Sequence, residues 1–317
     1  IKVMPLVGKG KVYEPLKVEI LGPRQSFPSG GFIGHRLATL IQDLFSGLIG
    51  NTLKQMGLLL KLRNQFDLCV CIGDIVPIFG AWLTKAPFIF IGCAKSDYFQ
   101  NSNYHYTFLE KWFLRRYCLL AFPRDLKTTQ NLKIQGIRAE FVGNPMMDAL
   151  EISGEDLGID PHSIVVGFLP GSRQDAYVNL EDLGRVAQKI LELAPKDKKV
   201  EFLVALATNL DKEAAVKIIP SSIPSKIIQG KFGDVLHHSH IIVGLSGTGN
   251  EQAVGLGKPV VTFPGRGVQH TKRFAQDKKG LLGDSISLVE ADPLKIAQEV
   301  WSILQDPEHL QDMRKAG

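Results

Sequence analysis

Short apolar runs alternate with longer stretches of helical periodicity along the whole chain, and this alternation constrains the fold more than any other feature. Short runs rich in β-branched and aromatic residues are typical of buried strands. Strands that alternate with helices predict parallel sheets covered on both faces, which is an α/β fold. The predicted strands are Ile1–Val7, Lys17–Leu21, Leu68–Gly73, Phe88–Gly92, Cys118–Phe122, Ala139–Val142, Ser163–Leu169, Val200–Ala205, Lys226–Gln229, Ile241–Leu245, Pro259–Phe263 and Ser285–Val289.

A cluster of polar residues, Gly and Pro interrupts the alternation near residues 150–161, and a fresh strand follows it. Each side of the break carries a comparable set of strands. A length of 317 residues also fits two ordinary domains. We therefore expect two Rossmann-like domains, residues 1–150 and 151–317, which face a cleft. In the second domain, residues 179–193 place their apolar side chains on one face of a predicted helix.

The most informative stretch for function is residues 240–257, HIIVGLSGTGNEQAVGLG, in which a strand runs through a Gly-rich turn into a helix. Gly247 and Gly249 allow a tight turn and close approach of a ligand. Ser246 and Thr248 can cap the helix or bond a phosphate, and the amino end of the helix favours an anion. The carboxylate of Glu251 accepts hydrogen bonds only, which suits the hydroxyls of a ribose. A capped turn with a stabilising acid is the alternative interpretation.

Two further loops close predicted strands of the same domain. Gly171, Ser172 and Arg173 follow the strand Ser163–Leu169, and the guanidinium group suits a phosphate. Gln269 and His270 follow the strand Pro259–Phe263 and could bond sugar hydroxyls or a phosphate. Carboxyl ends of parallel strands are where open α/β sheets bind ligands. An exposed arginine and a polar turn are the alternatives.

In the first domain, Asp74 ends an apolar strand and is a candidate general base, or else the cap of the next helix. A second Gly-rich loop contains Gly30, Gly31 and His35. These residues are candidates for contact with an acceptor, or they only turn the chain.

The formal charge of +5 is uneven, because residues 1–150 carry 18 Lys and Arg against 10 Asp and Glu, whereas residues 151–317 carry 19 against 22. A basic first domain suggests an anionic partner. Residues 32–60 are strongly apolar, and residues 98–117 mix aromatic with basic side chains, a combination that suits an anionic membrane surface. Core helices with a solvated basic face are the alternative. We expect no nucleic-acid partner.

The four cysteines lie in apolar runs and form no CxxC pair, so they indicate small buried hydrophobes in a reducing compartment and no metal site. No stretch reaches the roughly 18 uninterrupted apolar residues of a transmembrane helix. These observations predict a cytoplasmic protein, peripheral on the cytoplasmic face of a membrane if the basic, aromatic surface binds lipid.

With these motifs in order, the chain resembles the lipid-A-disaccharide synthase-related glycosyltransferases, which have the GT-B fold. The matching segments, from about residue 67 to residue 264, are LCVCIGDIVPIF, LLAFPRD, AEFVGNPMMDAL, FLPGSRQ and GLSGTGNEQAVGLGKPVV. The family has Ala-Ala-Leu between Thr and Glu, where this chain has Gly249-Asn250. The segment after the strand Phe88–Gly92 also differs, so the acceptor need not be a lipid A precursor.

The resemblance implies an inverting transfer from a UDP-sugar, of the UDP-N-acetylglucosamine type, to a lipid or other amphipathic acceptor. It implies no cofactor and no required metal. Ser246, Gly247, Thr248, Gly249 and Glu251 would hold UDP. Arg173 would reach the phosphates, and Asp74 matches the family's strand-end acid. Compared with the family, the first strand and helix of the N-terminal domain are expected to be absent.

Other functions use the same fold. A non-hydrolysing UDP-sugar epimerase shares the nucleotide pocket, but Gln252 stands where that family has a second glutamate. A non-catalytic protein that binds sugar nucleotides or lipids is another alternative. A nicotinamide enzyme is disfavoured, because no G-x-G-x-x-G with a downstream ribose acid follows a strand.

Overall fold

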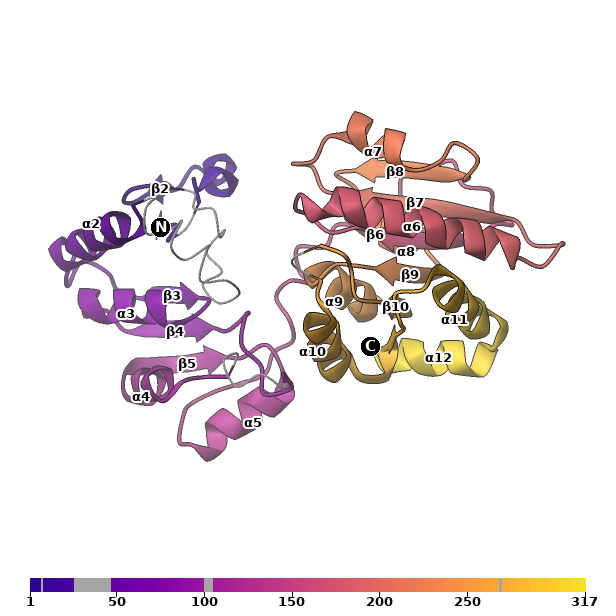
Figure 1. The fold of residues 1–317 in the computed structure, drawn as a ribbon. Coiled ribbons are helices and arrows are strands. Elements are labelled where there is room, and N and C mark those ends of the chain that lie inside the picture. The colour runs from indigo at the N-terminus through magenta and orange to yellow at the C-terminus, as the bar shows by residue number, and fades with distance from the viewer. Residues whose placement is uncertain (7, 26–46, 100–104, 268–269) are drawn as a thin grey trace. The chain divides into compact units, whose positions relative to one another are not determined.

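The computed structural model describes residues 1–6, 8–25, 47–99, 105–267 and 270–317 (Figure 1). The chain divides into two compact units, Ile1–Asp97 with Asn103–Gly143 and Tyr98–Ser102 with Asn144–Gly317. The division between Gly143 and Asn144 lies ahead of the boundary at residue 150 that the sequence predicts. Tyr98 and Phe99 group with the second unit, although they stand in the first half of the chain.

In the described part of the first unit, three parallel strands pair in the order β3-β4-β5. Capping side chains define where the helices around them begin: Asp74 caps α3, Thr107 and Glu110 form a capping box on α4, and Asp125 caps α5. The short strands β1 and β2 pair in parallel separately. The elements are β1 (Lys2–Val3), η1 (Lys11–Leu16), β2 (Glu19–Ile20), α2 (Leu48–Lys61), β3 (Cys69–Ile72), α3 (Ile75–Thr84), β4 (Phe88–Ile91), α4 (Phe108–Tyr117), β5 (Cys118–Phe122) and α5 (Leu126–Ile134).

In the described residues of the second unit, six parallel strands form one sheet in the order β11-β10-β9-β6-β7-β8. The helices between them are visible on either side of the sheet in Figure 1. The elements are β6 (Ile164–Leu169), α6 (Asp175–Glu192), β7 (Val200–Leu206), α7 (Lys212–Ile218), β8 (Ser225–Gln229), α8 (Phe232–His238), β9 (Ile241–Gly244), α9 (Thr248–Gly255), β10 (Val260–Thr262), α10 (Lys272–Leu282), η3 (Gly283–Ser285), β11 (Ile286–Leu288), α11 (Pro293–Gln305) and α12 (Pro307–Lys315).

The strand order reverses direction at β6. From β6 the chain proceeds outward to β7 and β8, and then returns to the other side of β6 with β9, β10 and β11. Such a reversal is a topological switch point, where loops leaving the two neighbouring strands diverge and leave room for a ligand. In this unit the switch point lies between β6 and β9.

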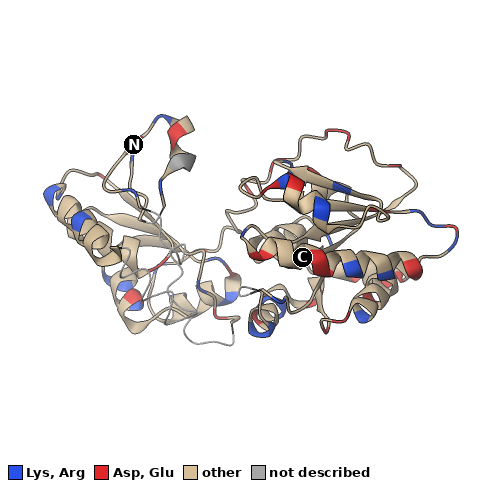
Figure 2. Cartoon of the chain, turned by 45° about the horizontal axis from the view of Figure 1, so that its top comes forward, with Lys and Arg blue, Asp and Glu red and all other residues tan. Residues whose placement is uncertain are grey.

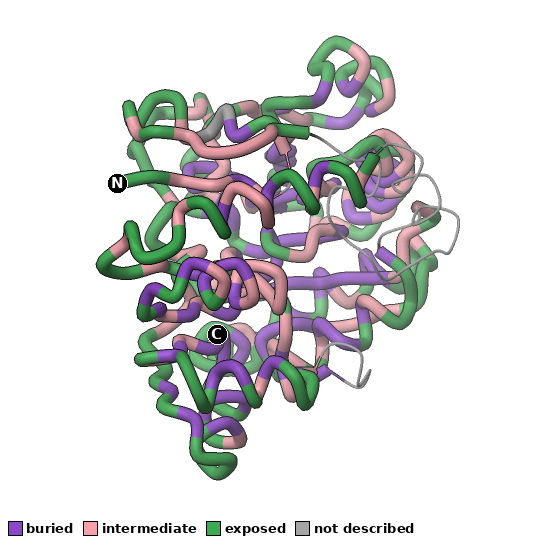
Figure 3. The backbone as a smooth tube through the Cα atoms, turned by 90° about the vertical axis from the view of Figure 1, so that its left-hand side faces the viewer, coloured by how far each residue is buried: buried purple, intermediate pink, exposed green. Residues whose placement is uncertain are grey.

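Two apolar clusters cover the opposite faces of this sheet. Val166 and Phe168 of β6 pack into a cluster that contains the buried face of α6 and residues of α11. Their neighbours Val165 and Leu169 pack into a second cluster with residues of α8 and α9. This alternation is the period of two that a strand imposes on its side chains. Figure 3 shows the buried residues running through the sheets, whereas exposed residues line the outer faces of the helices.

The α/β fold with parallel sheets and the helix over 179–193 are confirmed, and every described strand coincides with a predicted one. The predicted strand Ala139–Val142 is wrong, since the structure has only an isolated parallel bridge between Ala121 and Ala139. Phe141 and Val142 are exposed, and the chain then turns at Gly143 with φ of +93°. Among the described residues, no helix has the length and apolar character needed to cross a membrane.

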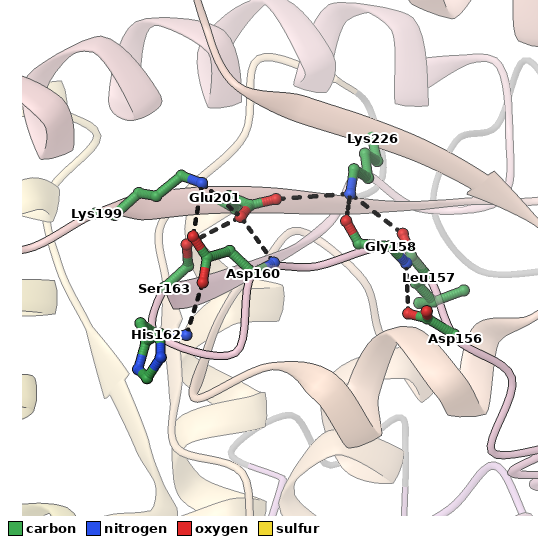
Figure 4. A network of polar contacts seen from close by, with 9 residues as sticks. All are labelled: Asp156, Leu157, Gly158, Asp160, His162, Ser163, Lys199, Glu201 and Lys226. Carbon is green, nitrogen blue, oxygen red and sulfur yellow. Dashed lines mark hydrogen bonds and ion pairs between the residues drawn. The ribbon is translucent and has the colours of Figure 1, made fainter.

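Charged residues lie mainly on helices and loops (Figure 2). An exception is Glu201, which is buried on β7 close to its start. Its Oε1 accepts from Ser163 Oγ at 2.9 Å and from the Asp160 N–H at 3.1 Å. Lys226 Nζ lies 3.6 Å from Oε2, and Lys199 Nζ lies 3.7 Å from Oε1 (Figure 4). The network ties the segment that precedes β6 to β7 and β8.

Burial opposes ionisation of Glu201, but the bonds from Ser163 and Asp160 and the nearby Lys226 and Lys199 outweigh it and lower the pKa of the carboxyl group. A group with a lowered pKa in the folded state stabilises the fold above its unfolded pKa. That stabilisation is lost as the pH falls through the folded pKa.

We predict that Glu201→Gln lowers the free energy of unfolding by roughly 1–3 kcal/mol at pH 7, because charge-assisted bonds to buried groups are lost. The difference from the wild type should shrink as the pH falls below the ordinary carboxyl range. Urea denaturation at several pH values measures both effects. Glu192→Gln, which breaks an exposed pair with Lys189, is the control and should change stability by less than about 0.5 kcal/mol. Equal effects of the two substitutions would contradict the prediction.

Candidate functional site

The turns that follow β6 and β9 lie side by side at the switch point. Leu169 pairs with Gly244 in the parallel ladder, and the Leu245 N–H donates to the Leu169 carbonyl at 2.8 Å. Gly171 has φ of +100°, a conformation that favours glycine, and a Cβ there would lie 3.4 Å from the Leu245 carbonyl oxygen. The structure therefore brings together the two turns that the sequence identified separately.

The turn after β9 is closed by its own polar groups. Ser246 Oγ accepts from the Gly249 N–H at 3.1 Å, and buried Asn250 donates from Nδ2 to the Gly244 carbonyl at 3.1 Å. Gly247 is the N-cap of α9 and offers no side chain, while Thr248, the first helical residue, is exposed. The amino end of α9 thus presents backbone N–H groups and the positive end of the helix dipole at the switch point.

The turn after β6 leads into α6 in a similar way. Ser172 and Arg173 are exposed, and the N-cap residue Gln174 makes no side-chain cap bond. Asn179 in α6 donates from Nδ2 to the Pro170 carbonyl at 2.8 Å, which holds the turn against the helix. Two helix amino ends and one arginine therefore lie on the two adjacent turns, an arrangement that suits an anionic ligand.

Glu251, the predicted ribose ligand, is only 7% exposed and forms an ion pair with Lys278 of α10. Asn144 Nδ2 lies 3.5 Å from Glu251 Oε2, at the limit of a hydrogen bond. Sequence reasoning missed Lys278, because the run Asp277-Lys278-Lys279 is typical of a solvent-exposed charged surface. The signal was available in the helical spacing, since Lys278 follows Phe274 by four residues and so shares its face of α10.

The loop after β10 includes His270, which is also buried. Thr262 Oγ1 donates to the Gly244 carbonyl at 2.7 Å and therefore accepts from His270 Nε2 at 2.9 Å. The imidazole packs edge-on against the Phe274 ring at 5.4 Å. Burial, and to a smaller degree the charge of Lys278, lowers the pKa of His270 to about 4. His270 thus joins its loop to β9 and β10, and a contact with the donor stays a prediction.

Arg266 anchors the same loop to α6. Its guanidinium donates to Asp182 Oδ2 at 2.9 Å and to Glu181 Oε2 at 2.8 Å. A Cβ at Gly267 would collide with the Asp175 side chain, so the loop passes α6 closely there. Gln269 lies outside the described residues.

In the first unit, Asp74 follows β3 and caps α3, since its Oδ1 accepts from the Val76 N–H at 3.0 Å. The role of Asp74 as a base stays a prediction. The cap uses Oδ1, and Oδ2 takes no part in it. Gly30, Gly31 and His35 lie outside the described residues. Among the residues that the structure describes, no three His, Cys, Asp or Glu side chains group as metal ligands.

We predict that the buried, neutral His270 makes stability depend on pH. A histidine whose pKa is lowered by folding binds its proton first in the unfolded state, so stability falls as the pH drops from about 6.5 to 4. The loss attributable to this group is roughly 3 kcal/mol. Urea denaturation should show that the His270→Gln variant loses less stability than the wild type between pH 7 and pH 4.5. A wild-type minus variant difference that does not change with pH would contradict this.

Curated proteins similar to this chain are lipid-A-disaccharide synthases. The enzyme from Syntrophotalea carbinolica is 25% identical over 226 residues, which are 61% of this chain and 53% of that protein. The enzyme from Trichlorobacter lovleyi is 27% identical over 202 residues, 55% of this chain and 50% of that protein. The chain thus spans about half the length of the curated relatives it matches. No protein-family profile matches the chain.

Solved structures support the fold over nearly the whole chain. UDP-GlcNAc 2-epimerase from Neisseria meningitidis, bound to UDP-GlcNAc, has a TM-score of 0.59 at 18% identity and covers 96% of this chain and 82% of that chain. MurG from Acinetobacter baumannii has a TM-score of 0.53 at 11% identity, with coverages of 99% and 84%. The chain is therefore similar in sequence to lipid-A-disaccharide synthases, and it has the GT-B fold.

Proposed function

We propose that this chain is part of an inverting glycosyltransferase that moves a sugar from a UDP-sugar, of the UDP-N-acetylglucosamine type, to a lipid or other amphipathic acceptor. The observation that carries the proposal is the pair of helix amino ends, those of α6 and α9, on adjacent turns of a topological switch point. Backbone N–H groups and helix dipoles in that position suit a diphosphate. The similarity to lipid-A-disaccharide synthases supplies the reaction class.

In this proposal the second unit binds the donor. The turn Ser246–Gly249 and the turn Gly171–Arg173 hold the diphosphate, and Glu251 accepts bonds from the ribose. A carboxylate has about four lone-pair positions, so in this proposal Glu251 accepts from a ribose hydroxyl in addition to its ion pair with Lys278. Gln269 and His270 contribute from the loop after β10.

Sugar transfer requires a general base for the acceptor hydroxyl and groups that stabilise the leaving UDP. Asp74 Oδ2 would take the proton from the acceptor hydroxyl as its oxygen attacks the anomeric carbon and the bond to UDP breaks. The amino ends of α6 and α9, together with Arg173, would stabilise the charge that develops on UDP, without a required metal or cofactor. Gly30, Gly31 and His35 remain proposed contacts to the acceptor.

A protein with this function should be stabilised by UDP, because a ligand that binds only the folded state raises the melting temperature by mass action. We expect UDP, and not NAD, to raise the melting temperature. Stabilisation by NAD alone would contradict the proposal.

With a UDP-sugar and a lipid extract, product analysis should show sugar transfer. An epimerase would instead convert the donor sugar with no acceptor present.

The Asp74→Asn variant should keep its affinity for UDP and lose the transfer activity.

We also propose that α4 meets an anionic membrane surface on the cytoplasmic side. The exposed apolar and aromatic side chains of this helix include Phe108 (81% exposed), Leu109 and Trp112. Arg115 and Arg116 continue the same exposed stripe, since they follow Phe108 by seven and eight residues. Aromatic side chains beside basic ones suit the headgroup region of an anionic bilayer.

Co-sedimentation with vesicles tests this surface. The protein should bind phosphatidylglycerol vesicles better than phosphatidylcholine vesicles, and the Arg115→Ala, Arg116→Ala double variant should bind roughly 10- to 30-fold more weakly, at about 1 kcal/mol per basic side chain. Val216→Ser, which alters an exposed apolar residue of α7, is the matched control and should leave binding unchanged. Equal binding to both vesicle types would contradict the proposed contact with an anionic membrane surface.

A further inference from the structure

Lys278 belongs to α10, and its side chain is surrounded by other groups of the second unit. Its side chain is 6% exposed, and its ammonium pairs with Glu251 Oε1. The ammonium also lies 5.2 Å from the centroid of the Phe274 ring and 5.8 Å from that of the Phe99 ring. Two aromatic faces and a carboxylate thus fix the position of this cation.

The cation stands against the proposed diphosphate turn. A Cβ at Gly247, the N-cap of α9, would lie 3.8 Å from Lys278 Cε and 3.0 Å from Phe274 Cζ. Lys278 therefore contacts the amino end of α9, where Glu251 occupies the first turn. The pair belongs to the site that the two helix amino ends define.

This position is costly for a lysine. A cation at the amino end of a helix opposes the helix dipole, and a buried ion pair is often no more stable than apolar residues of the same volume. Packing alone would be served as well by a methionine. The presence of a buried charged pair at this turn points to a role in the site.

The carboxylate of Glu251 is fixed from its other side as well. Asn144 Nδ2 lies near Oε2, and the adjacent Gln252 donates from Nε2 to the Met146 carbonyl at 2.8 Å. These contacts hold the first turn of α9 to the segment Asn144–Met146. Lys278 and Asn144 thus approach different oxygens of the carboxylate, Oε1 and Oε2.

We propose that Lys278 is a positioning residue of the nucleotide pocket, which holds the Glu251 carboxylate against the Gly247 turn in the orientation that accepts a ribose hydroxyl. The inference rests on the proposed function, because it takes UDP as the ligand. It assigns to α10 a part in nucleotide recognition that the sequence did not indicate.

Calorimetry with UDP and with 2′-deoxy-UDP separates positioning from packing. The wild type should prefer UDP by about 10-fold or more, the effect of one hydrogen bond to a charged group. In Lys278→Met the preference should collapse toward one, because the misoriented carboxylate no longer distinguishes the two ligands. Lys278→Arg should restore part of it. Lys272→Met, at the exposed start of the same helix, should keep the wild-type preference. Thermal unfolding of each variant checks that it is folded.

The outcomes are distinct. If Lys278→Met weakens both ligands in equal proportion, Lys278 only packs and the inference is overturned. Equal affinity of the wild type for both ligands also overturns it, while the proposed function stands. If the wild type binds neither ligand, the proposed function itself fails. Should Lys278→Met not fold, Glu251→Gln provides the same comparison, and an unchanged preference for UDP there overturns the inference.

Discussion

The parallel pairing of β6 with β9 is the contact on which the arrangement of the second unit depends. Since β6 also pairs with β7, the chain leaves β6 on one side toward β7 and β8 and returns to its other side with β9. Right-handed crossovers then place α6 and α9 on opposite faces, and the two apolar clusters on either side of β6 agree with this. The turns after β6 and β9 must separate above the sheet edge, so the ligand position follows from topology before any side chain is considered.

The side chains then determine what this position can bind. Helix dipoles and Arg173 make it favourable for an anion, yet the most buried charges there are a carboxylate and an ammonium that pair with each other. The Glu251–Lys278 pair adds no net charge, so its contribution is directional. It fixes lone pairs for hydrogen bonding beside the turn proposed to bind the diphosphate, which would let the site distinguish a nucleotide from a simple phosphate.

The sequence predicted the elements well because strand and helix periodicity is local. The edge of the sheet on which Gly171–Arg173 and Ser246–Glu251 meet also followed from alternation, since parallel strands share their carboxyl ends. Lys278, Phe99 and Asn144 were not assigned to the site, because their meeting depends on three segments distant in sequence. Ala139–Val142 failed as a strand for a related reason, since its composition suits a strand but a partner is present only at Ala139.

The Glu201 network lies where β7 begins, at the end of the strands away from the two ligand turns. The polar interactions that tie strands together and those that face a ligand are therefore separated by the length of the sheet. Substitutions in the turns that change which ligand the proposed site binds need not weaken the network, and substitutions in the network need not change the turns. Such a separation lets one scaffold acquire new specificities by substitution at one edge while the other edge preserves its stability.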